Sequence, residues 1–120
     1  MEIWYNPRCS KCRIAKEAVE AAGVEFDLRL YLEDAPSETE LRDVITRTGL
    51  EPWEICRTGD ASGLGVTLPA KDAAHRDEWI AAMVANPPLI QRPIVIADDG
   101  TAYVARDEES VSAAIEHSRK

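Results

Sequence analysis

Two cysteines, Cys9 and Cys12, lie three positions apart near the start of the 120-residue chain. Their segment contains several basic residues, and no acidic residue lies between Ile3 and Ala15, although the whole chain has a formal net charge of −8. Nearby positive charge stabilises a thiolate, which is the nucleophilic form of cysteine, and lowers the pKa of the thiol below its free value of about 8.5. The chemistry available to this pair is therefore nucleophilic attack and thiol–disulfide exchange.

The sequence around the cysteines predicts a strand, a turn and a helix. Residues 1–5 favour a β-strand, and residues 10–22 place apolar side chains on one helical face before Gly23 ends the helix. The first N–H groups of a helix have no internal partner and carry partial positive charge. Cys9, at the helix start, is therefore the predicted nucleophile, and Cys12, one turn further on, is placed to attack a species bound to Cys9. The neighbours expected to support them are Asn6, Arg8, Ser10 and Lys11.

Other uses of a Cys-x-x-Cys pair fit the chain less well. A zinc site needs further ligands, but Cys56, His75 and His117 are the only other cysteine and histidines, and none stands at finger-like spacing. No secretion signal precedes the pair, which argues against a static disulfide and favours the cytoplasm. A thiol phosphatase loop needs an arginine six positions after its cysteine, where Ala15 and Ala18 stand. We expect no metal site.

The composition predicts one soluble α/β domain over residues 1–120. The 22 acidic residues outnumber the 14 basic ones, which argues against direct binding to nucleic acid, because neutralising phosphates requires a basic surface. No apolar run approaches the ~20 residues that a membrane-spanning helix needs. The negative net charge does not argue against a protein partner.

A second strand is predicted at residues 24–32, where apolar and other residues alternate as in a strand with one buried face. A helix separates it from the first strand, so the two should be parallel and joined by a right-handed crossover. A Cys-x-x-Cys pair at the first turn of such a β-α-β unit is the thioredoxin-like redox signature.

The rest of the chain predicts a helical insertion and a second β-unit. Residues from about 34 to 86 read as helices, with a Ser37–Glu40 capping box and an irregular loop at Arg57–Gly65. Two antiparallel strands then flank an Asp-Gly turn, and Asp107 caps a final helix. The predicted fold is a four-stranded mixed sheet in the order β-α-β, helical insertion, β-β-α.

Three segments resemble the glutaredoxin-coupled arsenate reductase family: residues 6–13, 31–33 and 90–95. The resemblance runs over nearly the full length and implies a thioredoxin-like fold with a helical insertion. It also implies that Cys9 attacks arsenate, and that Pro93 is a cis-proline facing this cysteine. The arginines at the places where the family surrounds the oxyanion are Arg57, Arg92 and Arg106.

The resemblance implies no bound cofactor, but it does imply an external reductant, either glutathione with glutaredoxin or thioredoxin. Arsenate reductases of this group commonly keep a single cysteine in the motif, whereas this chain also has Cys12. Attack by Cys12 on the Cys9 adduct would release arsenite and leave a Cys9–Cys12 disulfide for a disulfide reductase. Two alternatives stay open: a general thiol–disulfide oxidoreductase, and a redox-switched regulator like the Spx-type branch, which binds RNA polymerase.

Overall fold

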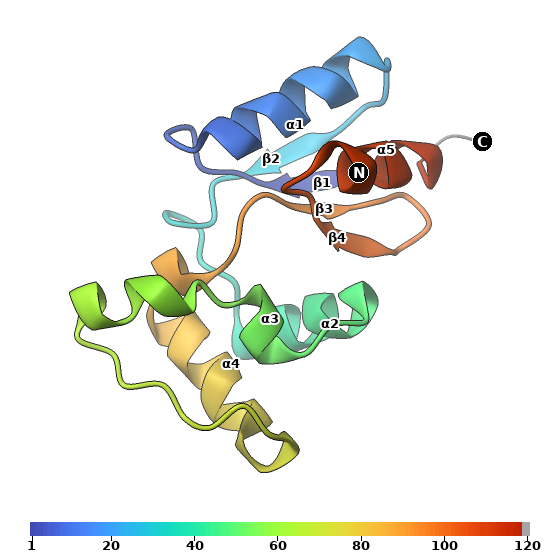
Figure 1. Ribbon diagram of the computed structural model, residues 1–120. Helices are drawn as coiled ribbons and strands as arrows, with labels where there is room; N and C mark the ends of the chain where they lie inside the picture. Colours follow the sequence, from blue (N-terminus) through green and yellow to red (C-terminus); the bar gives the residue numbers. More distant parts are fainter. Residues whose placement is uncertain (119–120) are drawn as a thin grey trace. The chain divides into compact units, whose positions relative to one another are not determined.

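The computed structural model describes residues 1–118, which form two compact units (Figure 1). The first unit combines Met1–Asp34 with the described residues from Arg92 onward, and the second comprises Ala35–Gln91. Both cysteines of the motif belong to the first unit, so this unit is built around the candidate chemistry.

The first unit contains a four-stranded mixed sheet in the order β2-β1-β3-β4. Its strands are β1 (Glu2–Trp4), β2 (Asp27–Arg29), β3 (Ile94–Ile96) and β4 (Ala102–Val104). β1 and β2 are parallel, whereas β3 is antiparallel to both of its neighbours, β1 and β4. The turn between β3 and β4 contains Gly100 at φ 92°, a conformation that glycine adopts without a steric penalty. The predicted fold class and hairpin are confirmed.

Helices α1 (Ser10–Ala21) and α5 (Glu108–Glu116) bury their apolar residues in one core with β1 and β3. α1 ends one residue before its predicted end, and Gly23 follows at φ 73°. The predicted cap of α5 is confirmed, because the Asp107 side chain accepts a hydrogen bond from the Ser110 N–H at 2.7 Å. The shared core residues are Ile3, Tyr5, Cys12, Ala15, Val19, Val95, Ala105, Val111, Ala114 and Ile115.

The second strand was predicted too long, and its predicted apolar face is buried only in part, where Val24 and Phe26 pack against the core. β2 has three residues, and the exposed fractions of Leu28, Leu30 and Leu32 are 40%, 39% and 44%. Tyr31 is buried instead, and the Arg29 guanidinium lies 5.4 Å from the centre of the Trp4 ring. The strand ends early because the chain turns after Arg29, with the Leu30 carbonyl accepting two backbone hydrogen bonds. Alternation specified the period of this segment but not which face is buried.

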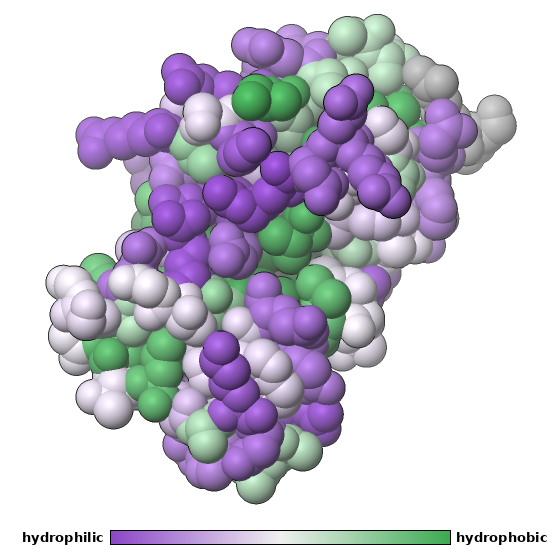
Figure 2. Space-filling model, viewed as in Figure 1, coloured by the Kyte–Doolittle hydropathy of each residue, from purple (hydrophilic) through white to green (hydrophobic). Residues whose placement is uncertain are grey.

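The second unit is helical, with α2 (Glu38–Thr48), α3 (Pro52–Ile55) and α4 (Arg76–Ala85). The predicted Ser37–Glu40 capping box at the start of α2 is confirmed. The loop predicted as irregular instead contains 3₁₀ turns at Thr58–Asp60 and Ser62–Leu64. Within residues 1–118, no helix has the length and apolarity to cross a membrane. Hydrophilic residues cover much of the face in Figure 2, with smaller hydrophobic areas between them.

Replacing Ile3 with alanine tests the core of the first unit. Ile3 is fully buried and lies between Leu28 and Val95 in the sheet register, so Ile3→Ala should lower the free energy of unfolding by about 2–5 kcal/mol. Urea unfolding of the full chain measures this loss. Ile14→Ala is the control, because Ile14 is 57% exposed and its loss should change stability by only about 0.5 kcal/mol. Equal effects of the two substitutions would contradict the assigned core.

Candidate functional site

Cys9 occupies the N-cap position of α1, with an extended backbone at φ −94° and ψ 120°. The backbone N–H groups of Lys11 and Cys12, in the first turn of the helix, lie near its sulfur and lower its pKa, although the sulfur does not form a capping hydrogen bond. No acidic residue lies in this first turn. The partial positive charge of the helix start therefore acts on the Cys9 thiolate without an opposing carboxylate.

Asn6 organises the turn that leads from β1 to Cys9. Its carbonyl accepts a hydrogen bond from the Cys9 N–H at 3.0 Å, and its side-chain Oδ1 accepts one from the Arg8 N–H at 3.0 Å. Its own N–H points to the Cys12 sulfur. The predicted supporting role of Asn6 therefore has a structural basis, since one residue contacts both sides of the cysteine pair.

The segment before β3 brings an arginine to Cys9. The Arg92–Pro93 peptide bond is cis, as expected, and the Arg92 side chain hydrogen-bonds the Cys9 sulfur. Two contacts with the end of β4 hold this segment. The Ala105 N–H donates to the Pro93 carbonyl at 2.9 Å, and Arg106 Nη1 donates to the Arg92 carbonyl at 2.6 Å. Arg106 is thereby fixed beside Arg92.

The two thiols of the pair have opposite acidities. Partial burial tends to raise the pKa of Cys9, but the nearby Cys12 N–H, Cys12 thiol, Lys11 N–H and Arg92 side chain together outweigh it, so the pKa lies below its ordinary value. Cys12 is fully buried, and this burial, together with the neighbouring Cys9 charge, raises its pKa to about 12. Cys9 is thus the more acidic thiol of the pair, and Cys12 is the buried thiol that stays protonated beside it.

The remaining predicted residues lie in different places. Arg8, Ser10 and Lys11 are exposed around Cys9. Arg57 belongs to the second unit, where its Nε donates to Asp60 Oδ2 at 2.7 Å. Cys56 is buried in the same unit, and burial raises its pKa to about 11. Among residues 1–118, no group of three or more histidine, cysteine or acidic side chains is arranged to hold a metal ion.

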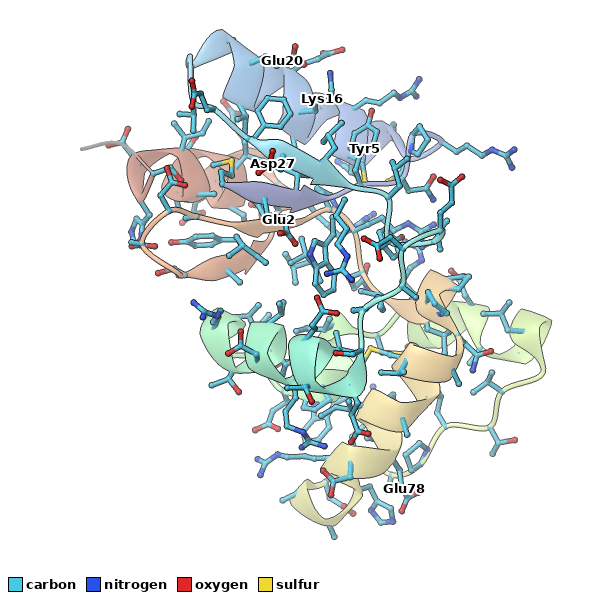
Figure 3. All side chains as sticks on the ribbon, turned by 180° about the vertical axis from the view of Figure 1, so that it is seen from behind. Glu2, Tyr5, Lys16, Glu20, Asp27 and Glu78 are labelled. Atoms are coloured by element: carbon cyan, nitrogen blue, oxygen red, sulfur yellow. The ribbon has the colours of Figure 1, made fainter. Side chains whose placement is uncertain are left out.

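Sequence reasoning missed a groove beside the cysteine turn. Its volume is about 390 Å³, and it lies between the turn that precedes Cys9 and the segment that follows β2. Tyr5 extends from the end of β1 toward α1 (Figure 3) and forms one wall. The sequence interpretation gave residues 24–32 one buried face. It therefore did not predict that Leu30 and Leu32 are exposed and line this groove. The lining residues are Tyr5, Asn6, Pro7, Arg8, Leu30, Leu32 and Glu33.

Comparisons with known proteins agree on one family. The ArsC family matches residues 4–114 of the chain. A protein from Streptomyces viridochromogenes, described as an uncharacterized protein in the glnII region, is 55% identical over 117 residues, which cover 96% of this chain and 98% of the relative. An arsenate reductase of Neisseria meningitidis serogroup A is 34% identical over 118 residues, covering 96% and 97%. The solved structure of an arsenate reductase from Vibrio cholerae has a TM-score of 0.70 at 32% identity, covering 97% of each chain.

The acidity of Cys9 can be measured by alkylation. The rate of reaction with iodoacetamide follows the thiolate fraction, so a lowered pKa places its rise with pH below the ordinary range for cysteine. Arg92→Gln removes one hydrogen bond to the thiolate and should move this rise to higher pH. Mass spectrometry identifies the modified cysteine, and Cys12 and Cys56 should remain unmodified at neutral pH.

Arg47→Gln is the control for this measurement, because Arg47 pairs with Asp43 in the second unit. Its pH profile should match that of the wild type. A profile of Arg92→Gln that also matches the wild type would show that Arg92 does not stabilise the thiolate.

Proposed function

We propose, because this chain belongs to the ArsC family, that it is a thiol oxidoreductase that reduces arsenate to arsenite through Cys9. The observation that carries the proposal is the position of Cys9 at the start of α1, where its pKa is lowered and the Arg92 side chain hydrogen-bonds its sulfur. The nucleophile Cys9 therefore lies beside Arg92, a cation that can bind an oxyanion. The arsenate reductases among the relatives support the choice of substrate.

In the first step, the Cys9 thiolate attacks the arsenic atom of arsenate. A sulfur–arsenic bond forms, one arsenic–oxygen bond breaks, and the oxygen leaves as water after taking up two protons. Guanidinium groups suit a tetrahedral oxyanion because their donors form a planar fork. We propose that Arg92 and Arg106, which are joined by a hydrogen bond in the first unit, bind the oxyanion, and the family resemblance adds Arg57 as a candidate. The proposed neighbours Ser10 and Lys11 belong to the same helix start.

In the second step, the Cys12 sulfur attacks the Cys9 sulfur of the adduct. The sulfur–arsenic bond breaks, and its electron pair stays on arsenic, which falls from oxidation state five to three and leaves as arsenite. The two sulfurs are oxidised to a Cys9–Cys12 disulfide, and the Cys12 proton is released to arsenite. The hydrogen bond between the two thiols supports this step. A glutaredoxin or thioredoxin system then returns the disulfide to two thiols.

A second candidate function is general thiol–disulfide exchange. The observation that favours it is the same pair, because a partly exposed, acidic thiol beside a buried thiol can also reduce a disulfide substrate. In that case the arginines contribute only through the acidity of Cys9. The two functions therefore differ in what Arg57 and Arg106 do.

A single-turnover assay tests the role of each cysteine. When the reduced protein is mixed with arsenate and no reductant, each arsenite formed should consume both thiols of the pair, as counted by thiol titration. Cys9→Ser should give no arsenite above the buffer blank, and Cys12→Ser should give none until an external thiol is added. Arsenite from Cys9→Ser at the wild-type rate would contradict the proposal, and Cys56→Ser serves as the control.

Substituting the arginines separates the two candidate functions. Arg57→Gln and Arg106→Gln should each lower kcat/KM for arsenate by about tenfold to a hundredfold, which corresponds to one charged hydrogen bond of roughly 1.5–3 kcal/mol. Reduction of a small disulfide should stay near the wild-type rate for Arg57→Gln, and it should fall less than arsenate reduction for Arg106→Gln, because Arg106 also holds the Arg92 segment. Equal losses in both assays would argue against oxyanion binding by these residues.

A further inference from the structure

The burial of Cys12 determines how the Cys9–Cys12 disulfide of the proposed function is re-reduced. Cys12 has no exposed surface in the reduced protein, whereas Cys9 is partly exposed. A reducing thiolate must therefore attack the Cys9 sulfur, forming a mixed disulfide with Cys9 and releasing Cys12 as a thiolate. A second thiol of the reductant then attacks the mixed disulfide, releases Cys9 and leaves the reductant as a disulfide. The reductant must consequently approach the face on which Cys9 is exposed.

A groove with both apolar and charged lining residues lies next to the turn that leads to Cys9. Pro7 and Arg8, which directly precede Cys9, form one side, and Leu30 and Leu32 form the other. Both leucines are more than a third exposed, at 39% and 44%, and Pro7 is also exposed. Arsenate, a hydrophilic ion, gains nothing from such side chains. A protein that buries them gains the free energy of removing apolar surface from water.

The charges beside the groove are also distinctive. In residues 1–118, Arg8 of the groove and Arg13 of α1 form no ion pair with a carboxylate. Lys11 lies near Asp107, whose pKa it lowers, and Glu33 is the acidic residue that lines the groove. In contrast, many other cations of the chain have a carboxylate partner: Lys16, Arg29, Arg42, Arg47, Arg57 and Arg76. Unneutralised cations on a chain of net charge −8 create a local field that attracts an acidic partner.

We propose that the groove formed by Pro7, Arg8, Leu30 and Leu32 is the docking surface for a dithiol disulfide reductase with acidic residues around an apolar contact. The proposal rests on the proposed function, because it requires the Cys9–Cys12 disulfide. Docking here brings the partner's attacking thiol to Cys9, and the basic residues of the turn and of α1 complement the partner's acidic residues.

The test measures how fast the disulfide is reduced after oxidation by diamide, so it does not depend on arsenate. Reduced thioredoxin, re-reduced by NADPH and thioredoxin reductase, is the protein probe, and dithiothreitol is the small-molecule probe. The double substitution Leu30→Ser with Leu32→Ser should lower the second-order rate constant with thioredoxin about tenfold. The rate constant with dithiothreitol should not change. The thioredoxin rate of the wild type should also fall as salt is added.

The second unit provides a matched control. Leu50 and Leu64 are exposed to nearly the same extent as Leu30 and Leu32, at 39% and 43%, so Leu50→Ser with Leu64→Ser should leave both rates unchanged. Ile14→Ser tests the other exposed apolar side chain near the cysteines, on α1. Slowing by Ile14→Ser without slowing by the Leu30 and Leu32 substitutions would overturn the proposal.

The outcomes distinguish this proposal from the proposed function. If diamide leaves both thiols of the pair free, the internal disulfide does not form, and both proposals fail. If the disulfide forms and thioredoxin reduces every variant at the same rate, only the docking surface is wrong. A thioredoxin rate that does not respond to salt would likewise overturn the assigned charge of the partner.

Discussion

The contact between the Cys9 sulfur, the start of α1 and Arg92 is the interaction on which the site depends. It follows from the pairing of two strands. β1 and β3 are antiparallel with Trp4 opposite Ile94, so the chain that leaves β1 and the chain that enters β3 meet at one end of the sheet. Cys9 follows the first of these positions and Arg92 precedes the second. The central position of β1 therefore places a nucleophile from one end of the sequence beside a cation from the other.

The same helix start gives two identical side chains different chemistry. Cys9 stands before the first turn of α1, where N–H groups face it, whereas Cys12 completes that turn and packs in the core with Ala15 and Val19. A thiolate at Cys12 would lose its hydration and lie beside the Cys9 charge, and both effects raise the pKa of Cys12. One helical turn thus separates a thiol that starts a reaction from a thiol that can complete it without being exposed to competing reactants.

Local signals in the sequence predicted the helices and strands, whereas features that depend on long-range contacts were not predicted. Gly23, Asp107 and the Ser37–Glu40 capping box act within a few residues, and the structure has each as predicted. The alternation of residues 24–32 could not show which face is buried, because that depends on the packing of neighbouring segments. The exposure of Leu30 and Leu32, and the groove that they line beside the cysteine turn, were accordingly not predicted.

The arginines show how far a sequence resemblance alone can specify a site. Sequence resemblance listed Arg92 and Arg106 as oxyanion ligands, but the hydrogen bond from Arg106 Nη1 to the Arg92 carbonyl links positions 14 residues apart and required the fold. A guanidinium has five donors, so this bond leaves others available for an anion. Because the bond already holds the Arg106 guanidinium in place, less side-chain entropy remains to be lost when an anion binds. Arg106 can therefore hold the cis Arg92–Pro93 segment and contribute to oxyanion binding at the same time.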